Sequence, residues 1–429
     1  MKQLQLMVVQ LVIAIHMLSC STDDLGGANE EPVVLADEIE IYEESKLENN
    51  SLVLAIENAG KAAYLLTKQG QRAYEWEFNA NLGNDLELLP NGKLLGMFKV
   101  EDPQFSFGGY GGIIKIMDTN AEEEWEYNYS SEDFLAHHDA EMLPNGNVLF
   151  LVWERTSVSE AQALGINAHF DTFTEALIEV NPVSNEIVWE WHSLDHLVQD
   201  VDSNLPNFGI INENPQLIDH NYNILVDEYG GDIMHANGID YDEDNDLIFV
   251  SVNFYGEVWV IDHSTTSTEA GTHTGGNYGK GGDLIYRFGN PEAYNHDYGT
   301  QLFHKVHFPN LLENNVPGQG NMLVFVNGSE QQSTVYELRL PETYELKLDQ
   351  SNEPEVVWSF SHPDLYAAII SGAVRLENGN TLICEGDFGF WEVTQDKEVV
   401  WKYNGGGEQR YWRAYNYKLD DPALTQLGL

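Results

Sequence analysis

Basic residues are scarce in this chain of 429 residues, which has 20 Lys and Arg against 70 Asp and Glu and a formal net charge of −50. Such a balance excludes extended basic patches and therefore argues against nucleic acid or an anionic membrane surface as a partner. Disorder is also excluded, because 42% of the residues are hydrophobic and 11% are aromatic. An anionic substrate would need local positive or hydrogen-bonding groups within an acidic molecule.

Cysteine is nearly absent, with Cys20 and Cys384 as the two examples. A disulfide framework is therefore excluded. Cys384 lies in the strand-like segment TLICEG, where a small buried thiol is favoured over a catalytic one.

A long hydrophobic run is also missing, since the apolar stretch from residue 4 to residue 18 is too short to span a bilayer comfortably. This stretch has the layout of a secretory signal. Its ending, Leu-Ser-Cys, resembles a bacterial lipoprotein signal, in which Cys20 becomes the lipidated first residue. Plain secretion with cleavage near Ser21 is the alternative.

The sequence thus divides into a signal peptide at 1–20, an acidic flexible tether at 21–45 and one domain at 46–429. We expect an extracytoplasmic protein that touches the membrane through its lipid anchor only. The membrane face and the oligomeric state stay open.

Helical periodicity is rare, and two strand-like sequence patterns recur instead. Asn-Gly or Gly-rich turns followed by apolar runs occur as LPNGKLLGM (89–97), LPNGNVLFL (143–151), PGQGNMLVFVNG (317–328) and LENGNTLIC (376–384). In the second pattern, aromatic and polar residues alternate; it occurs near Trp76, Trp125, Trp189, Tyr286, Trp358 and Trp401. Six occurrences predict an all-β repeat fold, a six-bladed β-propeller, with a pair of β-sandwiches as the alternative.

Three histidine-bearing segments precede or open strands of different repeats: 137–139 (His-His-Asp), 235–237 (His-Ala-Asn) and 303–308 (FHKVHF). A propeller would bring them together around its axis. Imidazole can act as a nucleophile, an acid or base, or a cationic clamp, so the group suits transfer of a charged group. His235 and Asn237 are two residues apart and would share one face of a strand.

A metal is the competing interpretation, because three histidines with Asp139 would suit zinc. No ligand pair has the helical i, i+4 spacing, and we expect neither a metal nor a cofactor. In WHSLDHLVQD, His192, Asp195 and His196 favour a structural role over a polar lid, and His273 is expected in a solvated loop.

These segments together resemble the bacterial arylsulfate sulfotransferase family, in the branch with a long STT…GGDLxYRxGNP insert. The resemblance rests on HHDAEMLPNGNVLF, WEWHSLDHLVQD, HANGIDYDEDNDLIFVSV and the insert, and it runs from about residue 50 to the end. It implies a six-bladed propeller that moves a sulfuryl group from an aryl sulfate to a phenol without a nucleotide donor. The implied mechanism is ping-pong, through a sulfated histidine.

By the same resemblance, His138 matches the first-motif histidine, and His235 with Asn237 matches the pair that cradles the sulfate. The nucleophile is His307, with His304 as the alternative, and Asn253 stands where better-known members carry arginine.

Four residues are assigned to substrate binding, namely His137, Asn253, His304 and Arg287. Arg287 and Arg375 are the candidates to replace the missing arginine. The family's Gln and Asp beside the nucleophile are absent. Two alternatives therefore remain, a non-catalytic propeller that binds a sulfated or phenolic ligand and a different hydrolase or metal enzyme.

Overall fold

A computed structural model describes residues 33–224, 230–328, 332–405 and 410–429. Contacts divide the chain into two units, Met1–Val34 and Leu35–Leu429, and the second unit carries the strands. The predicted signal peptide, Cys20 and the first part of the predicted tether lie outside the described residues. Among the described residues, no helix has the length and apolar character needed to cross a membrane.

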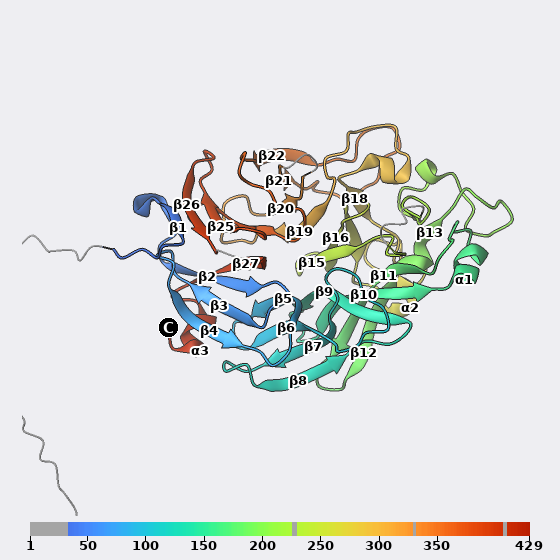
Figure 1. Ribbon diagram of the computed structural model, residues 1–429. Coiled ribbons are helices and arrows are strands. Elements are labelled where there is room, and N and C mark those ends of the chain that lie inside the picture. The colour runs from blue at the N-terminus through green and yellow to red at the C-terminus, as the bar shows by residue number, and fades with distance from the viewer. Residues whose placement is uncertain (1–32, 225–229, 329–331, 406–409) are drawn as a thin grey trace, which may run out of the picture. The chain divides into compact units, whose positions relative to one another are not determined.

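The unit is all-β, as predicted, with its sheets arranged as in a β-propeller (Figure 1). Three sheets have four strands each, in the orders β27 (Tyr411–Lys418), β2 (Ser51–Glu57), β3 (Ala62–Leu66), β4 (Arg72–Glu77); β15 (Ala236–Asp242), β16 (Leu247–Val252), β17 (Glu257–Asp262), β18 (Tyr286–Phe288); and β19 (Val306–Leu311), β20 (Asn321–Val326), β21 (Thr334–Arg339), β22 (Glu355–Phe360).

An eight-stranded sheet has the order β12 (Glu186–His192), β11 (Thr172–Asn181), β10 (Val148–Thr156), β9 (Phe134–Met142), β5 (Leu82–Leu88), β6 (Leu94–Lys99), β7 (Gly112–Met117), β8 (Glu123–Asn128). Its two halves are four-stranded antiparallel meanders, joined by one pair of residues, Asn84 on β5 and His138 on β9.

A five-stranded sheet has the order β1 (Ile39–Tyr42), β26 (Val399–Asn404), β25 (Gly389–Val393), β24 (Thr381–Glu385), β23 (Gly372–Arg375), and β13 (Leu197–Val198) pairs with β14 (Ile218–Asp219). Since β1 pairs with β26, the ordered unit begins before the predicted boundary at residue 46. The helices of the described residues are short: η1 (Glu44–Lys46), α1 (Val158–Ala163), η2 (Ser193–His196), η3 (Ile211–Glu213), α2 (Ser267–Ala270), η5 (Pro291–Tyr294) and α3 (Pro422–Leu427).

One strand of each meander lies innermost, and these strands contact one another in a closed ring: β27, β5, β9, β15, β19, β23 and back to β27. In Figure 1 the sheets fan outward from this ring. The last strand, β27, closes it by pairing with β2. The repeated aromatic patterns lie on the outer strands β4, β8, β12, β18 and β22, and on β26, which β1 covers.

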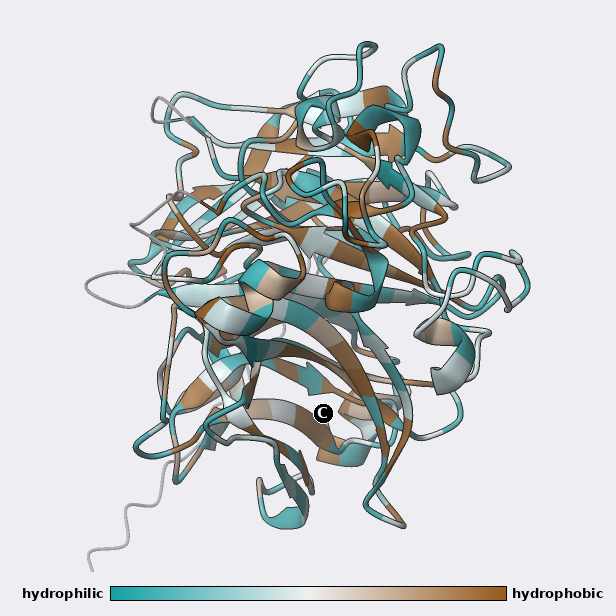
Figure 2. Ribbon diagram, turned by 90° about the vertical axis from the view of Figure 1, so that its right-hand side faces the viewer, coloured by the Kyte–Doolittle hydropathy of each residue, from teal (hydrophilic) through white to brown (hydrophobic). Residues whose placement is uncertain are grey.

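The predicted turns follow one hydrogen-bond pattern. Leu89 N–H donates to the carbonyl of Lys93, and Leu143 N–H donates to that of Asn147. Gly92 and Gly146 adopt φ of 81° and 83°, a conformation that favours glycine. The apolar runs after these turns are buried between sheets, and Figure 2 shows hydrophobic strands joined by hydrophilic loops.

A buried ion pair ties the first sheet to the five-stranded one. Nζ of Lys68, in the turn after β3, lies 2.6 Å from a carboxylate oxygen of Glu392 on β25, and both side chains are fully buried. Glu392 also accepts from the backbone of Glu48 and the side chain of Asn380. The pair therefore links sheets from opposite ends of the chain.

Replacing Lys68 with Met should lower the free energy of unfolding by about 3–5 kcal/mol, because it leaves the Glu392 carboxylate buried without its counter-charge. Urea denaturation measures this. The matched control is Lys46→Met, which removes an exposed pair with Glu398 and should cost far less, because solvent screens such a pair. Equal losses of unfolding free energy in the two variants would show that the buried pair contributes no more than the exposed one.

Candidate active site

His235 directly precedes β15 and His307 is near the start of β19, whereas His138 lies in the middle of β9 and not before a strand as predicted. The backbone is irregular at each of these places. His138, His235 and Phe308, the residue after His307, have φ of 55°, 55° and 53°. The pairing register of β9, β15 and β19 with the next strand shifts at the same places. Such bulges redirect side chains, and left-handed backbone at non-glycine residues is concentrated at functional sites.

The rings from two of these strands meet directly. The centroids of His138 and His235 lie 4.7 Å apart, with the planes at 82°. His137 points the other way and stacks on Trp153 at 3.7 Å. It therefore supports His138 rather than facing the same space.

Hydrogen bonds link Glu175, His137 and His138 in a chain. Nε2 of His137 lies 2.9 Å from a carboxylate oxygen of Glu175, and Nδ1 of His137 lies 2.8 Å from Nδ1 of His138. Burial lowers the pKa of both histidines and raises the pKa of Glu175. The chain can thus pass a proton between Glu175 and His138, and the sequence analysis gave Glu175 no role.

His235 has the opposite ionisation tendency. Burial acts to lower its pKa, but Asp232 outweighs this and raises the pKa above the ordinary value. Oδ2 of Asp232 lies 2.5 Å from Nδ1 of His235, and Oδ1 accepts from the His235 backbone N–H. Phe254 stacks on the other side of the ring at 4.7 Å. Asp232 therefore favours the protonated form of His235, and sequence reasoning missed Asp232 as its partner.

His307, on β19, is buried and neutral. Burial, with His235 and Arg413 nearby, lowers its pKa to about 3. Its Nδ1 lies 3.4 Å from the amide nitrogen of Asn253, which also donates to the carbonyl of Val306. The structure thus brings two predicted site residues, His307 and Asn253, together.

Asn237 faces the protein itself. Its amide nitrogen donates to the carbonyl of Val306 at 2.9 Å, and its oxygen accepts from Ser251. The side chain thereby fastens β15 to β19 beside His307, and its role as a donor to the sulfate stays a prediction.

A guanidinium does reach this region, from a residue that sequence reasoning missed. Arg413 on β27 donates to Asp139 and to the backbone carbonyl of Asn237, both at 2.9 Å, and lies over the ring of Phe308. Burial opposes its charge, and Asp139 favours it, with the net pKa raised. The local signal was weak, an arginine among aromatic residues in the final strand.

The other predicted residues lie elsewhere or in different surroundings. His304 is exposed, whereas His307 is buried. Arg287 on β18 is fully buried, paired with Glu257 and bonded to the carbonyl of Leu217, so it is not free to bind substrate. Arg375 pairs with Glu337. Cys384 is buried, as expected for a structural thiol.

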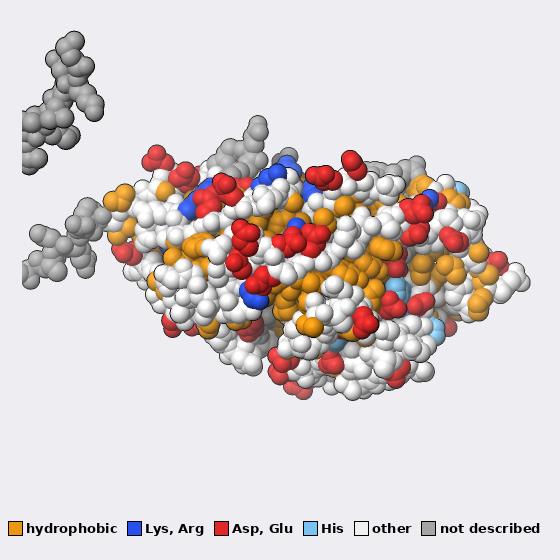
Figure 3. Space-filling view, turned by 90° about the horizontal axis from the view of Figure 1, so that it is seen from below, with side chains coloured by type: hydrophobic (Ala, Val, Ile, Leu, Met, Phe, Trp, Pro, Cys, Tyr) orange, Lys and Arg blue, Asp and Glu red, His pale blue; other side chains and the backbone are white. Residues whose placement is uncertain are grey.

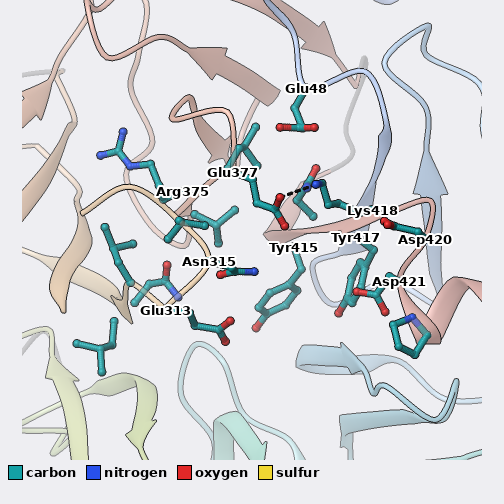
Figure 4. A pocket seen from close by; sticks show the side chains of 18 residues that line it. Glu48, Glu313, Asn315, Arg375, Glu377, Tyr415, Tyr417, Lys418, Asp420 and Asp421 are labelled. Atoms are coloured by element: carbon teal, nitrogen blue, oxygen red, sulfur yellow. Dashed lines mark hydrogen bonds and ion pairs between the residues drawn. The ribbon is translucent and has the colours of Figure 1, made fainter. Parts of the chain in front are cut away.

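A pocket of about 440 Å³ lies at the far ends of the same innermost strands, beyond Asn310 on β19 and Tyr415 on β27 (Figure 4). Arg375 and Lys418 are its cations, and Lys418 pairs with Glu377. The other charged side chains are carboxylates, Glu48, Glu313, Glu377, Asp420 and Asp421. The excess of carboxylates at this end of the innermost strands disfavours binding of an anion. The face shown in Figure 3 also disfavours it, because Asp and Glu outnumber Lys and Arg there.

The chain belongs to the arylsulfotransferase (ASST) family, whose model matches residues 28–411. No curated protein matches it. Among solved structures it is similar to the WD40 domain of Toxoplasma gondii coronin (11% identity, TM-score 0.40, 88% of this chain and 73% of that chain). It is also similar to a putative 6-phosphogluconolactonase of Bacteroides fragilis (10% identity, TM-score 0.41, 86% and 99%).

Changing Asp232 to Asn should lower the pKa of His235, because the charge that opposes the burial effect is removed. Histidine-labelled protein titrated by NMR measures this, with the His235 signal assigned from its absence in His235→Gln. Asp364→Asn, which alters an exposed contact 3.8 Å from His362, is the control and should leave the His235 titration unchanged. An unchanged His235 pKa in Asp232→Asn would refute the pairing.

Proposed function

We propose that this protein is an aryl-sulfate sulfotransferase that moves a sulfuryl group from an aryl sulfate to a phenol by a ping-pong mechanism, through a sulfated His307 and without a nucleotide donor. The observation that carries the proposal is that the pKa values of two histidines at the site are shifted in opposite directions. A neutral His307 and a cationic His235 come from adjacent innermost strands. A nucleophile needs an unprotonated nitrogen, and the sulfuryl oxygens need positive charge.

In the first half-reaction, a ring nitrogen of His307 attacks sulfur, the bond from sulfur to the aryl oxygen breaks, and the leaving phenolate takes a proton. The chain from Glu175 through His137 to His138 supplies that proton. In the second half, a phenol attacks the sulfur of sulfohistidine and returns its proton to the same chain. His307 is regenerated, so protons and sulfuryl groups balance over the cycle.

Several cationic groups lie near His307, and two of them, His235 and Arg413, are each paired with a carboxylate, Asp232 and Asp139. His235, Lys305 and Arg413 all act electrostatically on His307. Arg413 lies against Asp139 and Asn237, so it positions β9 and β15, and its positive charge acts on His307. His235 is then the group placed to hold the sulfuryl oxygens, in place of the arginine that Asn253 replaces.

We propose six blades for the propeller, with each half of the eight-stranded sheet counted as one blade, because a single residue pair joins the halves. We also propose that Cys20 is lipidated and that the domain works outside the cytoplasm. The sequence pattern at residues 1–20 supports this.

A non-catalytic role in binding a sulfated or phenolic ligand is the second candidate. It is favoured by two departures, Asn253 in place of arginine and the apolar neighbours Val306 and Phe308 around His307. The same experiment separates the two candidates.

Incubation of the purified protein with an aryl sulfate and no acceptor should add about 80 Da, the mass of one SO₃ held covalently on histidine. Intact-protein mass spectrometry detects it. The adduct should be absent in His307→Ala and retained in His304→Ala, the matched exposed histidine. Turnover should fall by on the order of 10³-fold or more in His307→Ala. No adduct and no phenol release across several donors would favour the binding role.

Turnover should fall as pH rises through the pKa of His235, because only the cationic ring neutralises the sulfuryl oxygens. In Asp232→Asn this alkaline limb should move to lower pH, and kcat/KM at neutral pH should fall on the order of 10-fold. A pH–rate profile of both proteins is the measurement. A limb at the same pH in both would assign it to a different group.

A further inference from the structure

A second group of histidines lies apart from the innermost strands. His196 ends η2, after β12, and His273 with Asp283 flanks the glycine-rich stretch of the insert between β17 and β18. One ligand atom from each of the three side chains lies within 4.8 Å of the others. From the sequence, His196 is expected to be structural and His273 to lie in a solvated loop, because the separation of 87 positions between His196 and Asp283 hides the cluster.

Both imidazoles point at one oxygen. Nδ1 of His196 lies 2.8 Å, and Nδ1 of His273 lies 2.7 Å, from Oδ1 of Asp283. Three groups that each carry a lone pair meet in one place. A divalent cation can accept a lone pair from all three groups at once.

The other ring nitrogen of His196, Nε2, already makes a hydrogen bond. Nε2 lies 2.8 Å from the carbonyl oxygen of Ala270 and donates to it. This contact leaves Nδ1 as the nitrogen available to a cation. Ligating histidines typically use their second N–H in this way, because the bond fixes the tautomer and the ring orientation.

The surroundings hold the group rigidly. Trp191 lies parallel to the His196 ring, with centroids 5.6 Å apart, and its Nε1–H donates to the carbonyl of Gly282. A Cβ at Gly282 would come within 2.1 Å of the Ala270 oxygen and 2.6 Å of His196 Nε2. A glycine is therefore required for this close approach. The helix α2, which carries Ala270, contacts β12 (Figure 1).

The donor set suits zinc. Two imidazoles and one carboxylate are ligands of Zn²⁺ and related transition metals, whereas Ca²⁺ and Mg²⁺ prefer oxygen alone. Bonds of about 2.0–2.1 Å in a tetrahedral site place the ligands roughly 3.3 Å apart, so the side chains need to open by about half an ångström. His273 also lines a cavity of about 540 Å³ with Leu205 and Phe208, which gives an ion a path from solvent.

We propose that His196, His273 and Asp283 bind one zinc-class divalent ion, which fastens the insert between β17 and β18 to the end of β12. The fourth position of the ion takes water from the cavity. This site is separate from the sulfuryl-transfer histidines and stands whether or not that function does.

The test is equilibrium dialysis of chelator-treated full-length protein against Zn²⁺ with excess Mg²⁺, which occupies weak carboxylate sites. We expect one equivalent of zinc by elemental analysis, together with a rise in the thermal unfolding temperature. His273→Ala should weaken the binding by at least about 10-fold and abolish the rise. The exposed side chain of His273 makes this variant safe for folding.

His362→Ala is the matched control, since His362 is also partly exposed beside a carboxylate, Asp364, but has no second histidine partner among the described ion pairs. It should bind zinc as the unchanged protein does. Absence of stoichiometric zinc, or equal affinity in His273→Ala and His362→Ala, would overturn the proposal.

Discussion

Pairing of the last strand with the first long one is the interaction on which the rest of the structure depends. β27 pairs with β2 from Ser51 opposite Lys418 to Glu57 opposite Tyr411. This pairing closes the ring of innermost strands and places Arg413 between β9 and β15. Without closure, the histidines of three strands would have no common axis, and Asp139 would lose its buried counter-charge.

Burial then decides what each histidine can do. Chemically equal imidazoles are neutral or cationic according to the one charged neighbour they have in a medium of low polarity. Asp232 keeps His235 cationic, whereas His307 has an amide, Asn253, beside it and stays neutral. In a chain with a net charge of −50, the buried cations are themselves paired, His235 with Asp232 and Arg413 with Asp139.

The two histidine groups show how position in the fold divides one residue type between roles. On the innermost strands, bulges with left-handed backbone turn the rings of His138 and His235 toward each other. In the insert, a glycine-rich loop wraps His196 so closely that its ring is fixed from both sides. The first arrangement brings rings from two strands together, and the second directs two nitrogens at one carboxylate.

The sequence by itself determined the local features: all-β strands and turns with glycine at positive φ, such as Gly92. These follow from turn chemistry and from the two-residue period of a strand, which act between neighbours in the chain. Only the tertiary structure decided that Arg413 and not Arg287 reaches the site, that Asp232 and Glu175 govern the histidines, and that His196 meets His273. Those partners are set by ring closure and by bulges, which no short pattern encodes.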